Sequence, residues 1–378
     1  MTMNDRFAAV IAQIDEWIGP AGVPGAAVVV SFQGEFAAEH YAGEASPGVP
    51  IEERTLFGLA SVTKPVTAAT VLSCVEEGLL ALDEPAARFV PEFVTDTDTS
   101  IDFYNPELDA LRGEVTVRQL LAHLSGLPED LPAGYLSLKK RPNLQTYIDA
   151  MQRQPLTFAP GTALRYSNAG YALLARIVER LTGNDFWLEA DRRIIEPLGV
   201  RDIVARPGPA LTERIAEVAD VARAGTDVAA YNSDYWRQLA IPWGGLYGSA
   251  RDLVQFATAF LPGGPALLSQ AATQAMIADQ AHGVAGGVGS LRLHWETAFW
   301  GLGWEVRGTK TRHWTGDLAS PATFCHFGAA GTLLWADPTR KLAVAVFANR
   351  TTAHLWPFAP PRWARLNNEL VALADTLI

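Results

Sequence analysis

The chain has 378 residues, of which 49% are hydrophobic and 19% charged, and its formal net charge is −11. This composition supports a sizeable apolar core and excludes wholesale disorder. The acidic balance also argues against a nucleic-acid partner, which needs clustered Lys and Arg. The two cysteines, Cys74 and Cys325, form neither a disulfide framework nor a metal motif, so we expect two buried thiols.

The start of the chain carries no export signal. Gln13, Asp15 and Glu16 interrupt the first apolar stretch, which a secretory leader would keep continuous. No apolar run in the chain approaches the ~20 residues that a membrane helix needs. We therefore expect a cytoplasmic protein with no membrane partner.

The first part of the chain predicts a helix, a hairpin and a second helix. Residues 4–18 have apolar side chains at helical spacing, which is typical of an amphipathic helix. Two β-like runs, 25–32 and 35–43, flank a turn at Gln33-Gly34 and predict a hairpin. Residues 62–76 are rich in Ala and predict a helix that Gly78 stops.

From residue 82 to 297, helical segments alternate with loops rich in Pro and Gly. The expected helices are 116–123, 168–181, 185–198 and 249–261. The segment 283–289 fits neither a phosphate loop nor a dinucleotide fingerprint, so it is interpreted as a flexible surface loop.

After residue 298 the chain becomes β-rich again. Strand-like runs cover 299–306, 322–327, 332–336 and 342–348, and a last helix begins near Pro361. This order predicts an α/β domain made from both chain ends, residues 1–82 and 298–378. Residues 83–297 would form an inserted, mainly helical domain.

Ser61-Val62-Thr63-Lys64 is the first segment with a chemical signature. Pro65 is tolerated only if a helix starts close by, which places Ser61 near a helix N-terminus. Lys64 then lies about one turn later on the same face. Its amine adjoins the Ser61 hydroxyl at the N-terminus of the helix, which is the positive end of the helix dipole. That pairing is a plausible activated nucleophile.

A second Ser-x-x-Lys occurs at Ser137-Leu138-Lys139-Lys140. It lies between Pro132-Ala133-Gly134 and Arg141-Pro142, where no helix can hold the two side chains together. We interpret this second match as accidental.

Two further segments carry polar residues of types that occur in active sites. Tyr166-Ser167-Asn168 precedes a strong helix, and taken alone Asn168 could cap that helix while Tyr166 packs in the core. His326-Phe327-Gly328 ends a strand, where a lone histidine is usually structural.

Together and in this order, the three segments resemble the serine β-lactamase and penicillin-binding-protein superfamily. The nearer likeness is to its class C β-lactamase-like branch, which includes family VIII carboxylesterases and D-aminopeptidases. The resemblance implies an antiparallel sheet flanked by helices, with an active site at its junction with the inserted helical domain. It implies neither a metal nor an organic cofactor.

The resemblance also implies a role for each residue. Ser61 would be the acylated nucleophile, and Lys64 would share its proton network. Tyr166 would be the general base, its phenolate favoured by the nearby ammonium, although a neutral Lys64 is an open alternative. Asn168 would orient Lys64 and polar groups of the substrate. The backbone N–H groups of Ser61 and Ala329 would form the oxyanion hole.

His326 and Gly328 are implied to orient the substrate, and His326 marks a departure from many relatives. Many β-lactamases and penicillin-binding proteins carry a lysine there, whereas a histidine is largely neutral near pH 7. Esters and amides without a nearby carboxylate become the favoured small-molecule substrates. One or two of six tryptophans are expected to line the acyl pocket: Trp236, Trp243, Trp295, Trp300, Trp304 and Trp314.

The sequence therefore predicts a serine hydrolase, most simply a carboxylesterase on small or medium esters. A D-aminopeptidase, amidase or weak β-lactamase is one alternative, and an acyl transferase is another. A non-catalytic penicillin-binding-type sensor is a third. The sequence leaves the oligomeric state open.

Overall fold

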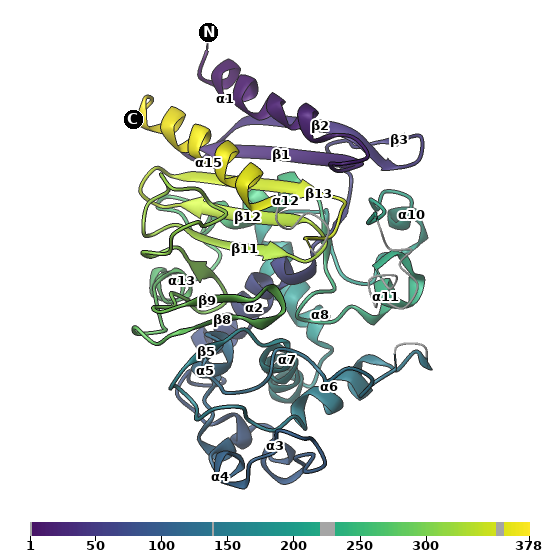
Figure 1. Ribbon diagram of the computed structural model, residues 1–378, viewed down its shortest axis with the longest axis vertical. Coiled ribbons are helices and arrows are strands. Elements are labelled where there is room, and N and C mark those ends of the chain that lie inside the picture. The colour runs from purple at the N-terminus through teal and green to yellow at the C-terminus, as the bar shows by residue number, and fades with distance from the viewer. Residues whose placement is uncertain (1, 138–139, 220–230, 353–358) are drawn as a thin grey trace.

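The computed structural model describes residues 2–137, 140–219, 231–352 and 359–378. Figure 1 shows a β-sheet towards one end of the molecule and mainly helices towards the other, with α2 (Thr63–Glu76) between them. Two residues of the second Ser-x-x-Lys segment, Leu138 and Lys139, lie outside the described residues.

The main sheet combines the two ends of the chain. Within the described residues it has seven strands in the order β10-β11-β12-β13-β1-β2-β3, and every neighbouring pair is antiparallel. The strands are β1 (Gly25–Phe32), β2 (Glu35–Ser46), β3 (Val49–Pro50), β10 (Glu305–Val306), β11 (Phe324–Gly328), β12 (Thr332–Asp337) and β13 (Leu342–Ala348). The predicted α/β class with an antiparallel sheet is confirmed.

The centre of the sheet is buried on both faces. Every residue of β1 and β13 is buried, which explains why both strands are continuous apolar runs rather than alternating ones. Ala26, Val28 and Val30 point into one apolar cluster, and Ala27 and Val29 point into the other. The sheet therefore separates two cores.

Helices from different parts of the chain cover the two faces. The terminal helices α1 (Met3–Ile11) and α15 (Ala359–Asp375) contact each other over one face, as Figure 1 shows. The other face packs against α12 (Ala250–Thr258), which contacts β1 and β13. α12 lies within residues 83–297, the segment that we predict to form the inserted helical domain. That segment therefore contributes one helix that packs directly on the sheet.

The remaining elements are short. The further helices are α3 (Glu92–Thr95), α4 (Pro106–Asp109), α5 (Val117–Leu121), α6 (Leu144–Gln152), α7 (Asn168–Thr182), α8 (Phe186–Ala190), α9 (Glu196–Leu198), α10 (Pro209–Thr212), α11 (Asp234–Leu239) and α13 (Gln270–Ile277). Two small sheets contain β4 (Phe57–Gly58), β6 (Ile203–Val204) and β7 (Tyr247–Gly248), and β5 (Leu164–Arg165), β8 (Gly286–Val288) and β9 (Leu293–Trp295). None of the described helices is long and apolar enough to cross a membrane.

Three predicted elements differ from the structure. The first helix ends at Ile11 and continues as a 3-10 helix over Ala12–Trp17. The segment 185–198 contains a π-helical stretch at Asp191–Ile195 between α8 and α9. The run 299–306 is a strand only at its end, Glu305–Val306. Gly301, earlier in the run, passes so close to Met276 that a Cβ there would lie 2.0 Å from the Met276 carbonyl oxygen.

The interpretation of 283–289 as a flexible surface loop is wrong. Its residues Gly286–Val288 form β8, which pairs with β5 and β9. A Cβ at Gly286 would lie 1.9 Å from the Leu164 carbonyl oxygen, and one at Gly287 would lie 2.0 Å from that of Leu293. Glycine is therefore needed here for close strand packing rather than for flexibility.

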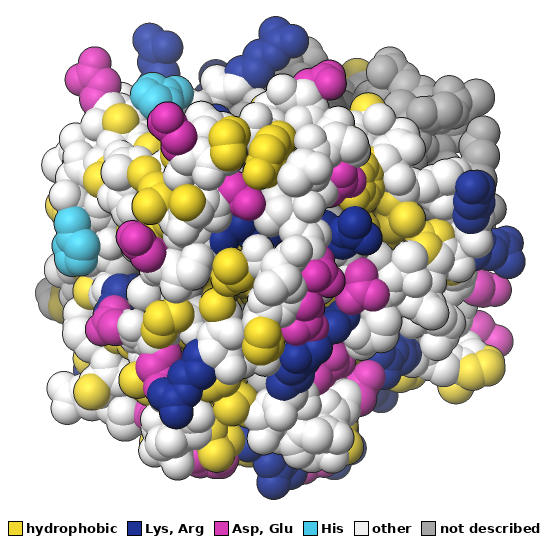
Figure 2. All heavy atoms as spheres, turned by 90° about the horizontal axis from the view of Figure 1, so that it is seen from below, with side chains coloured by type: hydrophobic (Ala, Val, Ile, Leu, Met, Phe, Trp, Pro, Cys, Tyr) yellow, Lys and Arg dark blue, Asp and Glu magenta, His cyan; other side chains and the backbone are white. Residues whose placement is uncertain are grey.

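Faces remote from the sheet carry mixed charge. Figure 2 shows the molecule from below, where Lys and Arg side chains are interspersed with Asp and Glu. Ion pairs of Arg with Asp also occur in the described chain, such as Arg118 with Asp83 at 2.7 Å and Arg176 with Asp149 at 2.6 Å. The acidic excess of the chain is therefore not gathered into one patch on this face.

Candidate active site

Ser61 lies at a sharp turn between β4 and α2. The turn is a 3-10 helix over Ala60–Val62, and Ala60 has φ +45°, a left-handed conformation that is uncommon for a residue with a Cβ. One turn later, Lys64 donates from Nζ to Ser61 Oγ at 3.1 Å. The expected contact between hydroxyl and amine is therefore present.

Lys64 is completely buried, and none of the described residues forms an ion pair with it. Its Nζ also donates to the Trp243 carbonyl oxygen at 2.8 Å, and no carboxylate of the described residues lies within 4.0 Å of it. Burial lowers the pKa of Lys64 well below its ordinary value of 10.5, although the charges of Asp130 and Glu129 oppose this. The surroundings thus favour a neutral amine, which can accept a proton.

Burial shifts the pKa of Tyr166 in the opposite direction. Burial raises the pKa of Tyr166 well above 10.0, and only the nearby Ser61 hydroxyl opposes the shift. Lys64 Nζ lies 4.6 Å from the centre of the Tyr166 ring, over its face. A neutral amine there supplies no positive charge, so Tyr166 keeps its proton. These pKa directions favour the alternative in which a neutral Lys64 takes the proton.

Asn168 begins α7, but it does not cap the helix. Ser167 accepts the backbone N–H of Gly170 and is the cap. The side chain of Asn168 donates from Nδ2 to Asp130 Oδ2 at 3.2 Å. Its Oδ1 is buried without a hydrogen-bond partner, and no bond joins it to Lys64 among the described residues. The Trp243 carbonyl oxygen holds Lys64 instead.

His326 is buried and neutral at the end of β11. Burial lowers the pKa of His326 to about 3. Its Nδ1 lies 2.9 Å from the Phe327 carbonyl oxygen, and because a carbonyl can only accept, Nδ1 carries the proton. Nε2 is then an unprotonated acceptor, and it has no partner within the described part of the chain.

Gly328 brings β11 against the turn that holds Ser61. A Cβ at this position would lie 2.2 Å from the Leu59 carbonyl oxygen and 2.3 Å from Thr332 Oγ1. Thr332 Oγ1 also donates to that carbonyl at 3.0 Å. Only glycine allows this approach, which puts Ala329 at the same cavity as Ser61.

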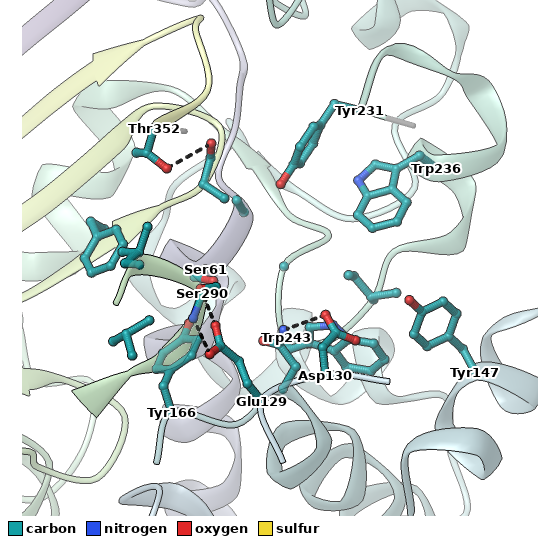
Figure 3. A pocket seen from close by; sticks show the side chains of 18 residues that line it. Ser61, Glu129, Asp130, Tyr147, Tyr166, Tyr231, Trp236, Trp243, Ser290 and Thr352 are labelled. Atoms are coloured by element: carbon teal, nitrogen blue, oxygen red, sulfur yellow. Dashed lines mark hydrogen bonds between the residues drawn. The ribbon is translucent and has the colours of Figure 1, made fainter. Parts of the chain in front are cut away.

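The cavity has a volume of about 460 Å³. Figure 3 shows its lining, which is Ala60, Ser61, Glu129, Asp130, Tyr147, Tyr166, Asn168, Tyr231, Trp236, Ile241, Trp243, Gly244, Val288, Ser290, Leu291, Phe327, Ala329 and Thr352. Two of the six tryptophans line it, as expected, and Trp300, Trp304 and Trp314 are buried in the core. The Ser61 hydroxyl therefore lies in a cavity that has an apolar, aromatic wall.

Sequence reasoning missed the acidic residues of the cavity. Glu129 accepts from the backbone N–H of Ser290 at 2.9 Å and also from its hydroxyl. Asp130 accepts from the Leu131 N–H at 2.8 Å and from Asn168. Both acids directly follow Gly126-Leu127-Pro128, a stretch whose Gly and Pro predict a loop.

One buried group of residues outside the cavity has side chains of metal-ligand type. Potential ligand atoms of Glu305, His313 and Cys325 lie within 4.8 Å of one another. Lys310 donates to Glu305 Oε1 at 2.7 Å, and His313 Nε2 lies 3.2 Å from the same oxygen. A lysine ammonium therefore already supplies the positive charge that the carboxylate needs.

The fold and the cavity define a serine hydrolase in which a buried amine adjoins the serine hydroxyl. The sequence matches the Beta-lactamase family over residues 7–366, so the chain belongs to that family. It is 32% identical over 355 residues to the esterase EstB of Burkholderia gladioli, covering 86% of this chain and 83% of that protein.

Other similarities agree with this placement. The chain is 33% identical over 298 residues to penicillin-binding protein 4 of Amycolatopsis lactamdurans, covering 75% of this chain and 71% of that protein. A solved structure of a family VIII carboxylesterase superposes with a TM-score of 0.76 at 20% identity, covering 98% of this chain and 96% of that one. At that identity the superposition shows the fold alone.

Proposed function

We propose that the protein is a carboxylesterase that hydrolyses small or medium esters through an acyl-enzyme on Ser61. The observation that carries this proposal is the hydrogen bond from the fully buried Lys64 to Ser61 Oγ inside an aromatic cavity. The likeness to esterase EstB supports the choice of esters.

The charges around the cavity also favour esters over substrates with a carboxylate. His326 is neutral, and no Lys or Arg is found among the described residues that line the cavity. A substrate carboxylate would therefore meet Glu129 and Asp130 without a fixed cation to hold it.

The proposed reaction has two halves. Neutral Lys64 takes the proton of Ser61 as Oγ attacks the ester carbonyl, and the developing oxyanion binds the backbone N–H groups of Ser61 and Ala329. The alkoxide leaves with the proton returned by Lys64, helped by the Tyr166 hydroxyl. Water then attacks the acyl-enzyme by the same route, which releases the acid and restores Ser61.

The direct test replaces the nucleophile. Ser61→Ala is expected to abolish turnover of short p-nitrophenyl esters and the transient acyl adduct in intact-mass spectra, because it removes the hydroxyl that is hydrogen-bonded to the buried amine. Ser137→Ala, in the second Ser-x-x-Lys, is the matched control and should keep full activity with the same melting temperature. Turnover by a folded Ser61→Ala protein would refute the proposal.

A reaction with β-lactams or D-amino-acid amides is the second candidate, favoured by the likeness to penicillin-binding protein 4. Comparing kcat/KM for p-nitrophenyl esters, D-amino-acid amides and nitrocefin distinguishes the two. The esterase proposal expects the ester values to be the highest of the three.

A further inference from the structure

His123 is a fully buried histidine to which the proposed reaction assigns no step. It is the second residue after α5, and its φ of +61° lies in the left-handed region. Helices often end on a residue in this conformation, but that residue is usually glycine, because a Cβ makes the conformation costly. The histidine at this position therefore indicates that its side chain is needed.

Two hydrogen bonds to His123 hold the backbone on either side of Tyr166. The carbonyl oxygen of His123 accepts from the Arg165 N–H at 3.0 Å, and its ring Nδ1 accepts from the Ser167 N–H at 3.0 Å. Tyr166 lies between these two donors, and its own N–H donates to the Gly287 carbonyl oxygen at 3.0 Å. Three consecutive N–H groups are therefore fixed, two of them by one histidine.

The hydrogen bond from Ser167 also sets the protonation state of His123. Because a backbone N–H can only donate, Nδ1 of His123 carries no proton, and the ring is neutral with its proton on Nε2. Burial lowers the pKa of His123 well below 6.5, which agrees with a neutral ring. The ring acceptor is therefore present at neutral pH.

The ring of His123 packs directly against the ring of Tyr166. The two ring centres lie 4.5 Å apart, and the ring planes are tilted by 41°. Trp300 and Tyr171 lie on the same histidine ring, with centres at 4.9 Å and 5.2 Å. All four side chains are buried, so His123 restricts the place of the Tyr166 ring as well as that of its backbone.

We propose that His123 is a positioning residue, which fixes the Tyr166 hydroxyl relative to Ser61 by holding the Ser167 N–H and by packing on the tyrosine ring. Tyr166 and Ser61 line the same cavity. A misplacement of about 1 Å in an active site can cost about 10²-fold in rate, so loss of this support should lower kcat. The effect on catalysis rests on the proposed function, but the link from His123 to Tyr166 does not.

Three substitutions separate the ring acceptor from the backbone conformation and from the packing. His123→Gly removes the ring without straining the left-handed backbone, and His123→Leu fills part of the space but cannot accept a hydrogen bond. Both should lower kcat/KM for p-nitrophenyl esters roughly 10- to 100-fold, mainly through kcat. His123→Asn tolerates the backbone conformation and offers Oδ1 as the acceptor, so it should stay within about fivefold of the unmodified protein.

A double-mutant cycle tests whether the effect passes through Tyr166. With Tyr166→Phe there is no hydroxyl to position, so adding His123→Gly should cost less than about threefold. His313→Leu is the matched control, because His313 is equally buried but contacts Glu305 and Trp314 instead. Its effect should be the same with and without Tyr166→Phe.

Melting temperatures show which variants are folded, and His123→Leu replaces His123→Gly in the cycle if the glycine variant is not. Equal losses from the His123 substitution in the two backgrounds would overturn the proposal. A His123→Asn protein as impaired as His123→Gly and His123→Leu would overturn it as well.

Amide hydrogen exchange tests the proposal without turnover. In protein carrying isotope-labelled serine, His123→Gly and His123→Leu should speed exchange of the Ser167 amide roughly tenfold or more, whereas His123→Asn should not. Unchanged exchange in all three variants would contradict the proposal even if esters are good substrates. Failure to hydrolyse any ester would refute the proposed function alone, and the exchange rates would still decide whether His123 holds the segment next to Tyr166.

Discussion

Lys64 is a buried amine whose surroundings do not stabilise a positive charge. It has no ion pair within the described residues, it is fully buried, and its two hydrogen bonds go to neutral oxygens. These surroundings disfavour the ammonium form, so the residue is poised to act as a base. Tyr166, which burial keeps protonated, is placed to donate a hydrogen bond rather than to abstract a proton.

The opposite pKa shifts of Lys64 and Tyr166 predict how kcat/KM depends on pH. A base works in its deprotonated form, so kcat/KM should rise with pH as Lys64 loses its proton. The midpoint of this rising limb should lie below pH 10.5. Lys64→Met should remove the limb and lower kcat/KM by about 10²- to 10⁴-fold. Tyr166→Phe should lower the rate while keeping the limb. If the limb vanished in Tyr166→Phe instead, the tyrosine would be the base.

Strand β10 is a single element that holds a buried charge. β10 is an edge strand, and its Glu305 is buried against Lys310 of the following turn. Burial alone would raise the pKa of Glu305, but Lys310 and His313 lower it overall. The amine of Lys310 lies 4.2 Å from the centre of the Trp295 ring and adds a cation–π contact.

Breaking this pair should destabilise the protein. Lys310→Met leaves the Glu305 carboxylate buried without its cation, which should reduce the free energy of unfolding by about 3–5 kcal/mol. The double variant Glu305→Gln/Lys310→Met removes both charges and should recover most of that loss. Urea unfolding measures both values, and equal losses in the two variants would contradict the charge argument.

At the scale of the whole molecule, buried histidines couple stability to pH. His123, His313 and His326 are all at least 98% buried by surface area, and burial lowers the pKa of each. As the pH falls below 6.5, the unfolded chain binds protons at these residues before the folded protein does. The stability they support is therefore present above pH 6.5 and decreases as the pH falls.

The size of this effect can be stated for His326. Its pKa of about 3 implies a loss of roughly 3 kcal/mol in the free energy of unfolding between pH 6.5 and pH 4. Urea unfolding at several pH values measures the slope, which His326→Asn should reduce. His294→Gln, at an exposed position of β9, should leave it unchanged. A slope that His326→Asn does not alter would contradict the assignment.

The sequence by itself determined those features that depend on local pattern. Apolar periodicity predicted the hairpin of β1 and β2, the helices α2 and α7, and the strands β11 to β13. Helix spacing predicted that Ser61 and Lys64 meet, since residues three apart share a helix face. The order of the elements predicted that both chain ends share one sheet.

Only the tertiary structure decided the features that depend on distant neighbours. The glycines of β8 look flexible in sequence, and only the close approach of Leu164 and Leu293 explains them. Glu129 and Asp130 line the cavity only because the fold brings Ser61 and the aromatic rings of other segments to the same place. The pKa shifts of Lys64 and Tyr166 follow from burial, because the free energy of a charge depends on all that surrounds it and not only on its neighbours in the chain.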